Sequence, residues 1–245
     1  MSIDGATGES PSGQRPMPPF ALFINMLTSP MEAFDELRIR PSKLLPIMLV
    51  VGLNVVLIYW YFTAVDFSWF VDDTLQNSNM SENQLDQARE NMEQMSASTL
   101  RMLGILGSTV AILAIYTLQA GYLTLASALG GHSQKFGQWL SLVAWTGIVV
   151  VFSQIGMAVT LLMDTTGQLS QYDLDPTTLR NLGLRPDNEN LERIMGSINL
   201  AMIWSLALMI MGHRRWLGTS LLKSVCIVGA PYLLIFGVWT FASLG

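Results

Sequence analysis

Apolar residues in this chain gather into five long runs that are separated by polar connections. The runs cover residues 44–65, 102–131, 136–163, 194–212 and 224–245. A helix needs about 20 predominantly apolar residues to cross the hydrocarbon core of a bilayer, and the runs match that length. The pattern therefore predicts an all-α fold, a polytopic membrane bundle of five transmembrane helices.

None of the five runs contains Asp, Glu, Lys, Arg or His. Ionisable side chains inside a membrane are the usual mark of proton relays, ion pathways and catalysis. The chain also lacks a Walker A loop, a dinucleotide fingerprint and a serine nucleophile elbow. His132 and His213 have no second ligand at metal-binding spacing, and Cys226 is the single cysteine. We therefore expect no enzyme, and no catalytic, cofactor-binding or metal-binding residues.

Composition agrees with one membrane domain, because charged residues make up 13% of the chain, about half the share in soluble proteins. Their distribution is unequal. The N-terminal region and the connections around residues 131–137 and 211–223 hold eight basic and five acidic residues, whereas residues 66–101 and 164–193 hold five basic and thirteen acidic ones. The positive-inside rule then predicts N-terminus in, C-terminus out, and two acidic outer loops. We expect a protein of the bacterial cytoplasmic (inner) membrane, in contact with the lipid bilayer and with no nucleic acid.

The segment before the first run contains no stretch long enough to span a membrane. Residues 1–19 are polar and rich in Pro, Gly and Ser, which predicts a disordered cytoplasmic leader. Residues 20–40 predict short amphipathic membrane-surface helices, the second of which starts at Pro30. Its apolar side chains share one face and include Met31, Phe34 and Leu37. The alternative for this helix is packing on the cytoplasmic end of the bundle.

The first outer loop carries a strong helix signal, a capping-box pattern at Ser81 and Gln84. Behind it, apolar side chains recur every three or four residues, and the candidates for docking a partner are Leu85, Ala88, Met92 and Met95. The stripe continues into the second run, which predicts one long helix projecting about five turns beyond the membrane. The stripe is expected either to pack on the outer segment before the fourth run or to dock another protein.

The second outer loop has helix signals of its own. Asp175 and Pro176 are expected to begin a short helix that Gly183 ends. A second helix is expected after Pro186 and Asp187 and should continue into the fourth run.

A few polar or helix-breaking residues interrupt the apolar runs. The side-chain amides are Asn54, Gln119, Gln154 and Asn199. Each amide needs a partner in hydrocarbon, so it either bonds to another helix or lines a path for a substrate or lipid headgroup. Gly229 and Pro231 are expected to kink the last helix and to free a carbonyl one turn earlier.

The chain resembles the Yip1-domain family. Bacterial members of that family begin with a Pro–x–x–Ala/Thr–Phe helix, a second Pro and then the first span, and the matching positions are Pro30, Ala33, Phe34, Pro41 and Pro46. Residues 125–145, with their Gly pair, and residues 199–224 also fit the family, as does a closing fifth span.

The resemblance implies a five-span bundle with its N-terminus inside. Eukaryotic relatives act in vesicle traffic and bind small GTPases through an Asp-Leu-Tyr-Gly-Pro motif, which is absent here, so GTPase binding is not expected. Bacterial relatives often accompany MacB-like ABC exporters. The resemblance thus predicts a non-catalytic accessory or scaffold subunit of an ABC-type export assembly, with a membrane or periplasmic protein partner. The alternatives are a stand-alone transporter or channel for a small or lipidic substrate, and a membrane-shaping or trafficking-type factor.

Overall fold

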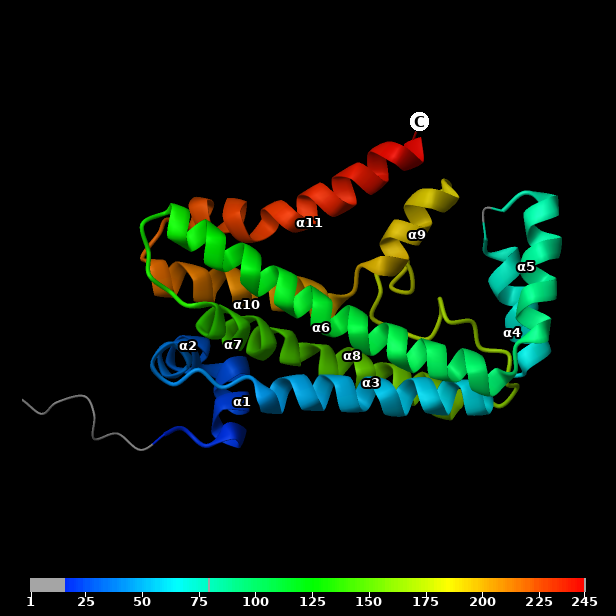
Figure 1. Cartoon of the computed structure of the whole chain (residues 1–245), viewed down its shortest axis with the longest axis horizontal. Helices are drawn as coiled ribbons and strands as arrows, with labels where there is room; N and C mark the ends of the chain where they lie inside the picture. Colours follow the sequence, from blue (N-terminus) through cyan, green and yellow to red (C-terminus); the bar gives the residue numbers. More distant parts are fainter. Residues whose placement is uncertain (1–15, 79, 245) are drawn as a thin grey trace, which may run out of the picture.

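The structure is a computed structural model that describes residues 16–78 and 80–244, and it is built from helices joined by loops (Figure 1). The longer helices are α3 (Leu44–Ala64), α6 (Ala97–Leu129), α7 (Phe136–Thr146), α8 (Val150–Met163), α10 (Leu200–Leu217) and α11 (Leu221–Leu244). The shorter ones are α1 (Pro19–Thr28), α2 (Pro30–Ile39), α4 (Phe67–Gln76), α5 (Glu82–Gln94) and α9 (Glu189–Ser197). A 3-10 turn, Gly147–Val149, joins α7 to α8. The predicted all-α membrane fold is confirmed.

Four helical stretches in the described part of the chain are long and apolar enough to cross a membrane: Leu44–Ala64, Ala97–Leu129, Phe136–Met163 and Leu221–Ala242. The stretch formed by α7 and α8 occupies the centre, because more than half of its most apolar part is buried. Only a small share of the corresponding part of α6 is buried, which suits contact with lipid.

The predicted fourth crossing, residues 194–212, is not one continuous helix. The backbone is extended at Asn199, whose side-chain oxygen accepts the N–H of Met202 at 2.8 Å and so caps α10. The backbone on either side pairs with the loop between α8 and α9, which is the second of the two loops predicted to lie outside, since the carbonyls of Ile198 and Thr177 accept N–H groups across the gap. The expected continuation of the outer helix into this crossing is therefore wrong, because capping and loop pairing replace the helical bonds. The count of five crossings stays a prediction.

The first two helices pack against one end of the bundle. Ala33, Phe34 and Leu37 on α2 are fully buried, and the indole N–H of Trp216 on α10 donates to the carbonyl of Phe34 at 2.8 Å. Gly212 permits the close approach of α10 to α7 and α2, since a Cβ at this position would lie 2.6 Å from Leu142 of α7 and 3.3 Å from the ring of Phe34. Of the two placements expected for this helix, the contacts describe packing on the bundle.

Two helices, and not one, connect the first outer loop to the second crossing. α5 ends at Gln94 and α6 starts at Ala97, because Ser96 between them is extended and its hydroxyl accepts the N–H of Thr99. The predicted long projecting helix is thus wrong: a second N-cap overrides the continuous apolar stripe. The capping box at Ser81 and Gln84 is present. α5 lies beside α4, and the two form a hairpin away from the bundle (Figure 1).

The basic connections gather at one end of the bundle. Figure 1 shows α1, α2, the α6–α7 connection and the α10–α11 connection together at that end. Arg215 donates two hydrogen bonds to Asp35 on α2, at 2.9 and 2.7 Å. His213 is buried in the same region, with Nδ1 3.0 Å from the hydroxyl of Ser224. The assignment of this end to the cytoplasm stays a prediction.

Candidate functional site: an apolar cavity between membrane helices

A cavity of about 500 Å³ lies between α6 and α11. Its lining contains no Asp, Glu, Lys, Arg or His and consists of Ile115, Tyr116, Leu118, Gln119, Tyr122, Val143, Gly147, Val150, Met202, Ser205, Pro231, Tyr232, Ile235 and Phe236. Leu118 and Ile235 are 72% and 59% exposed, whereas Val143 and Gly147 are buried. The cavity therefore opens sideways, from the buried centre of the bundle toward the surface that lipid would cover.

A proline in α11 determines how this helix meets α6. Pro231 has no N–H, so the carbonyl of Ile227, one turn earlier, has no helical donor. The hydroxyl of Tyr122 on α6 donates to this carbonyl at 2.8 Å. Gly229 is buried two residues before the proline, and the axis of α11 bends along its length in Figure 1. The freed carbonyl predicted from the proline is thus bonded to a neighbouring helix.

A second hydrogen bond joins the same two helices closer to the cavity. The side-chain amide of Gln119 donates to the hydroxyl of Tyr232 at 2.6 Å. Because α6 and α11 run in opposite directions, this hydrogen bond and that of Tyr122 follow one another along the helix pair. Ile115 and Phe236 lie beyond the hydrogen bond of Gln119 and line the cavity. The cavity thus extends past the last hydrogen bond between these helices.

The inner wall of the cavity depends on a glycine in the 3-10 turn between α7 and α8. A Cβ at Gly147 would lie 2.5 Å from the hydroxyl of Tyr116, so only glycine leaves room for this ring. A short 3-10 stretch inside a long helix often marks a hinge or a strained position. Here it allows a phenol from α6 to reach the central helix.

Two of the predicted intramembrane amides join helices away from the cavity. The amide of Asn54 on α3 donates to the hydroxyl of Ser108 on α6 at 2.8 Å. The amide of Gln154 on α8 donates to the carbonyl of Val50 on α3 at 2.9 Å, while its buried Oε1 has no partner among the described residues. These two contacts fit interhelical packing.

The remaining amide, Asn199, lies next to a buried carboxylate. Asp175 from the second outer loop is 7% exposed, and its Oδ2 accepts hydrogen bonds from Ser153 on α8 and from Asn199. Its Oδ1 accepts from the N–H and the hydroxyl of Thr177. Ser153 precedes the end of α8 by about 15 Å of helix, so the loop enters the space between α8 and α10.

This re-entry corrects the expectation of a short helix from Asp175 to Gly183. Residues 176–183 form turns that include an isolated β-bridge from Thr178 to Asn199, and Gly183 has a φ of +102°. The loop approaches α8 where Gly156 has no side chain, since a Cβ there would lie 3.1 Å from Pro176. Sequence reasoning missed the buried carboxylate because local signals at an Asp-Pro pair suit a solvated helix start equally well. The small residues Ser153 and Gly156 on α8 were the available signal for close packing.

Comparison with protein families agrees with this helical membrane architecture. The Yip1 domain model matches residues 24–242, which is nearly the whole chain. The chain belongs to the Yip1 domain family. No curated protein and no solved structure gives a significant match to it. The family assignment covers every helix from α2 to α10 and most of α11.

The residues predicted to dock a partner of this Yip1 domain pack mostly within the chain itself. Leu85, Ala88 and Met92 on α5 are half-buried against a cluster that includes Phe70 and Leu75 of α4. Met95, which follows α5, is 37% exposed. The apolar stripe therefore packs within the α4–α5 hairpin, and its use as a docking surface for a partner stays a prediction.

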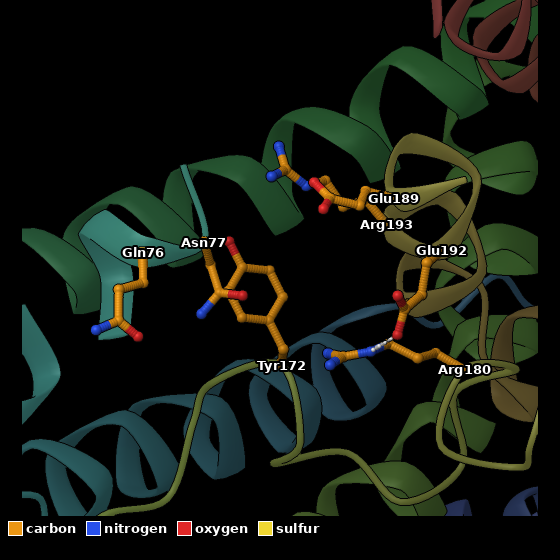
Figure 2. A pocket seen from close by; sticks show the side chains of 8 residues that line it. Gln76, Asn77, Tyr172, Arg180, Glu189, Glu192 and Arg193 are labelled. Carbon is orange, nitrogen blue, oxygen red and sulfur yellow. Dashed lines mark hydrogen bonds and ion pairs between the residues drawn. The ribbon is translucent and has the colours of Figure 1, made fainter. Parts of the chain in front are cut away.

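A polar cleft lies on the same Yip1 domain, outside the bundle (Figure 2). Its volume is about 220 Å³, and α4, α9 and the second outer loop line it. Arg180 donates to Glu192 at 2.8 Å and lies 3.8 Å from Asp173 and over the ring of Tyr172. The guanidinium of Arg180 is already neutralised by Glu192 and Asp173 of the same chain. These contacts therefore serve mainly to hold the loop to α9. No group of three His, Cys, Asp or Glu side chains able to hold a metal ion occurs in the described residues.

Proposed function

We propose that this Yip1 domain protein is a non-catalytic integral membrane protein that binds a lipid chain in the cavity between α6 and α11. The observation that carries the proposal is a neutral cavity that opens onto the apolar outer surface of the bundle. Its volume of about 500 Å³ lies within the usual range of ligand sites. A molecule that is already dissolved in the bilayer can enter without crossing water.

The lining favours a hydrocarbon chain over a polar solute. A chain that leaves the bilayer for the cavity gains little from the hydrophobic effect, because both environments are apolar. It gains dispersion contacts with fixed walls such as Val143 and Val150. A solute with several polar groups would instead leave most of them without partners.

Photo-crosslinking tests this proposal. The purified full chain is reconstituted with a phospholipid that carries a diazirine in one acyl chain, is irradiated, and is digested for mass spectrometry. We expect labels on Val143 and Met202 of the inner wall in addition to labels on lipid-facing residues. Labels confined to the lipid-facing residues would contradict the proposal.

A matched pair of variants on α10 makes the test specific. Met202→Trp fills the cavity, whereas Ile203→Trp adds the same ring at a neighbouring position that is 46% exposed and outside the lining. We expect the first variant to abolish labelling of Val143 and the second to leave it unchanged. Equal labelling in both variants would show that the label reaches Val143 by another route.

Lipid binding agrees with the sequence-based alternative of a transporter for a lipidic substrate, because binding is the first step that such a protein requires. The membrane-shaping alternative has less support. Phe34 and Leu37 are buried in the bundle, so the apolar side chains of α1 and α2 that remain exposed are others, such as Phe20, Met31 and Ile39.

A second candidate function is the accessory or scaffold role, and the α4–α5 hairpin favours it. The hairpin extends away from the bundle, and α5 buries no residue completely (Figure 1). Its exposed acidic side chains, which suit a partner with a basic surface, are Glu82, Asp86, Glu90 and Glu93. An ABC-type exporter component is the partner expected from the family resemblance, and the family match itself names no partner.

Co-purification from the native membrane in mild detergent tests this second role. A constant partner that is lost in Glu90→Lys/Glu93→Lys and kept in Glu32→Lys would support it, since Glu32 lies on α2 at the opposite end. A chain that always purifies alone would contradict it.

A further inference from the structure

The lining of the cavity contains five neutral polar side chains, which are Tyr116, Gln119, Tyr122, Ser205 and Tyr232. The hydroxyl of Tyr122 already donates to the carbonyl of Ile227. Gln119 and Tyr116 come from α6, and Tyr232 comes from α11. The Tyr232 hydroxyl accepts the amide of Gln119, so its own proton is left for another acceptor. The Tyr116 hydroxyl makes no hydrogen bond to any described residue. An unpaired hydroxyl in an apolar environment costs free energy, so two donors here favour a ligand that brings acceptors.

The absence of charged side chains from the lining restricts the class of ligand further. Since no ionisable side chain other than the tyrosines faces the cavity, a phosphate or carboxylate would lose its hydration without gaining a counter-charge. A neutral carbonyl oxygen has no such cost and accepts hydrogen bonds from phenols directly. The cavity therefore suits an uncharged headgroup with two acceptor oxygens.

Aromatic rings supply the third constraint. Tyr116, Tyr122, Tyr232 and Phe236 all line the cavity. Aromatic side chains favour stacked or edge-on contacts with a flat ring. A Cβ at Gly147 would lie 2.5 Å from the Tyr116 hydroxyl, so the glycine lets this ring lie against the inner wall of the cavity. A planar headgroup with an apolar tail combines these three requirements.

We infer that the cavity binds an isoprenoid quinone, with its carbonyl oxygens toward the hydroxyls of Tyr116 and Tyr232 and its tail toward the opening beside Leu118. The inference rests on the proposed function, because it specifies which lipid occupies the same cavity. It concerns binding alone and involves no electron transfer.

Binding of decylubiquinone to the purified full chain in nanodiscs tests the inference. Its affinity is measured by displacement of a diazirine-labelled lipid, and oleate, dioleoylglycerol and farnesol serve as competing probes. We expect decylubiquinone to displace the label at least about tenfold more effectively than oleate, as loss of one or two hydrogen bonds would produce. Dioleoylglycerol or farnesol competing better than the quinone would overturn the choice of headgroup.

Removal of single hydroxyls separates headgroup recognition from chain binding. Tyr116→Phe breaks no hydrogen bond within the described residues, and we expect it to weaken quinone binding about three- to tenfold while oleate binding stays constant. Tyr232→Phe should act in the same direction, and Tyr59→Phe, on an exposed ring of α3, should have no effect. If all probes displace the label from Val143 equally well in every variant, the quinone inference is refuted, whereas the proposed lipid site stands. If Val143 is not labelled at all, both the quinone inference and the proposed lipid site are refuted.

Discussion

Removal of the Tyr122 hydroxyl should destabilise the bundle only while Pro231 is present. The Tyr122→Phe variant loses the donor that lies 2.8 Å from the carbonyl of Ile227. Proline at position 231 offers this carbonyl no N–H. In a Pro231→Ala background, the alanine N–H can bond to the Ile227 carbonyl within the helix, so the tyrosine hydroxyl becomes redundant.

The magnitude follows from the environment of the carbonyl. Leaving a buried acceptor without a partner costs about 1–3 kcal/mol in proteins generally. Hydrogen bonds between membrane helices average about 0.6 kcal/mol, with a maximum near 1.7. We therefore expect Tyr122→Phe to lower the free energy of unfolding by about 1 kcal/mol, roughly a fivefold change in the unfolding equilibrium. In the Pro231→Ala background the same change should cost close to zero.

Reversible unfolding in mixed micelles of a mild detergent and dodecyl sulfate, followed by circular dichroism, measures the four free energies of this double-mutant cycle. The cycle isolates the coupling between the two positions from their separate effects. An equal cost of Tyr122→Phe in both backgrounds would refute the reasoning, because the hydroxyl would then act independently of the proline. A cost near zero in the wild-type background would refute it as well.

Three further predictions concern other contacts. Gly147→Ala places a Cβ 2.5 Å from the hydroxyl of Tyr116. It should lower the free energy of unfolding by about 1–3 kcal/mol and reduce lipid labelling of the inner wall. Gly121→Ala, whose Cβ would meet nothing within 4 Å, should change neither quantity in the same assays. Asp175→Asn replaces the carboxylate that accepts hydrogen bonds from Ser153 and Asn199 by an amide. It should lower the free energy of unfolding by about 1–3 kcal/mol, whereas the exposed Asp187→Asn should change it very little. The hydrogen bond from Arg215 lowers the pKa of Asp35, so the pair stabilises the fold above the ordinary Asp pKa of about 4 and ceases to do so as pH falls below it. A pH series of unfolding should show this small loss in the wild type and none in Asp35→Asn, and the absence of any difference would contradict it.

Sequence patterns alone predicted the helical membrane class and the family. Long apolar runs without charge have one stable form in a bilayer, because every backbone group must be satisfied within the segment. The Pro30–Phe34 pattern, together with Pro41 and Pro46, then indicated the Yip1 domain, which the family match confirmed. These conclusions depend on local composition and spacing, so no tertiary contact was needed to reach them.

The sequence also marked positions of consequence without showing what they contact. Gln119 and Pro231 stood out as polar or helix-breaking residues in apolar runs, yet nothing local indicated that both line one cavity. Tyr116 and Tyr122 were not singled out, because an aromatic residue in a membrane helix usually faces lipid or packs in the core. Their roles depend on α11, which lies about 100 residues away in the chain.

Only the tertiary structure decided where helices end and which loops enter the bundle. Ser96 and Asn199 each lie inside an apolar pattern that favours a continuous helix, but each caps a new helix in the structure. The re-entry of Asp175 depends on hydrogen bonds from Ser153 and Asn199, two residues that are distant in sequence and lie on different helices. Periodicity records which face of a helix is apolar, whereas a cap or a buried carboxylate is stabilised by particular partners, and those become neighbours only when the chain has folded.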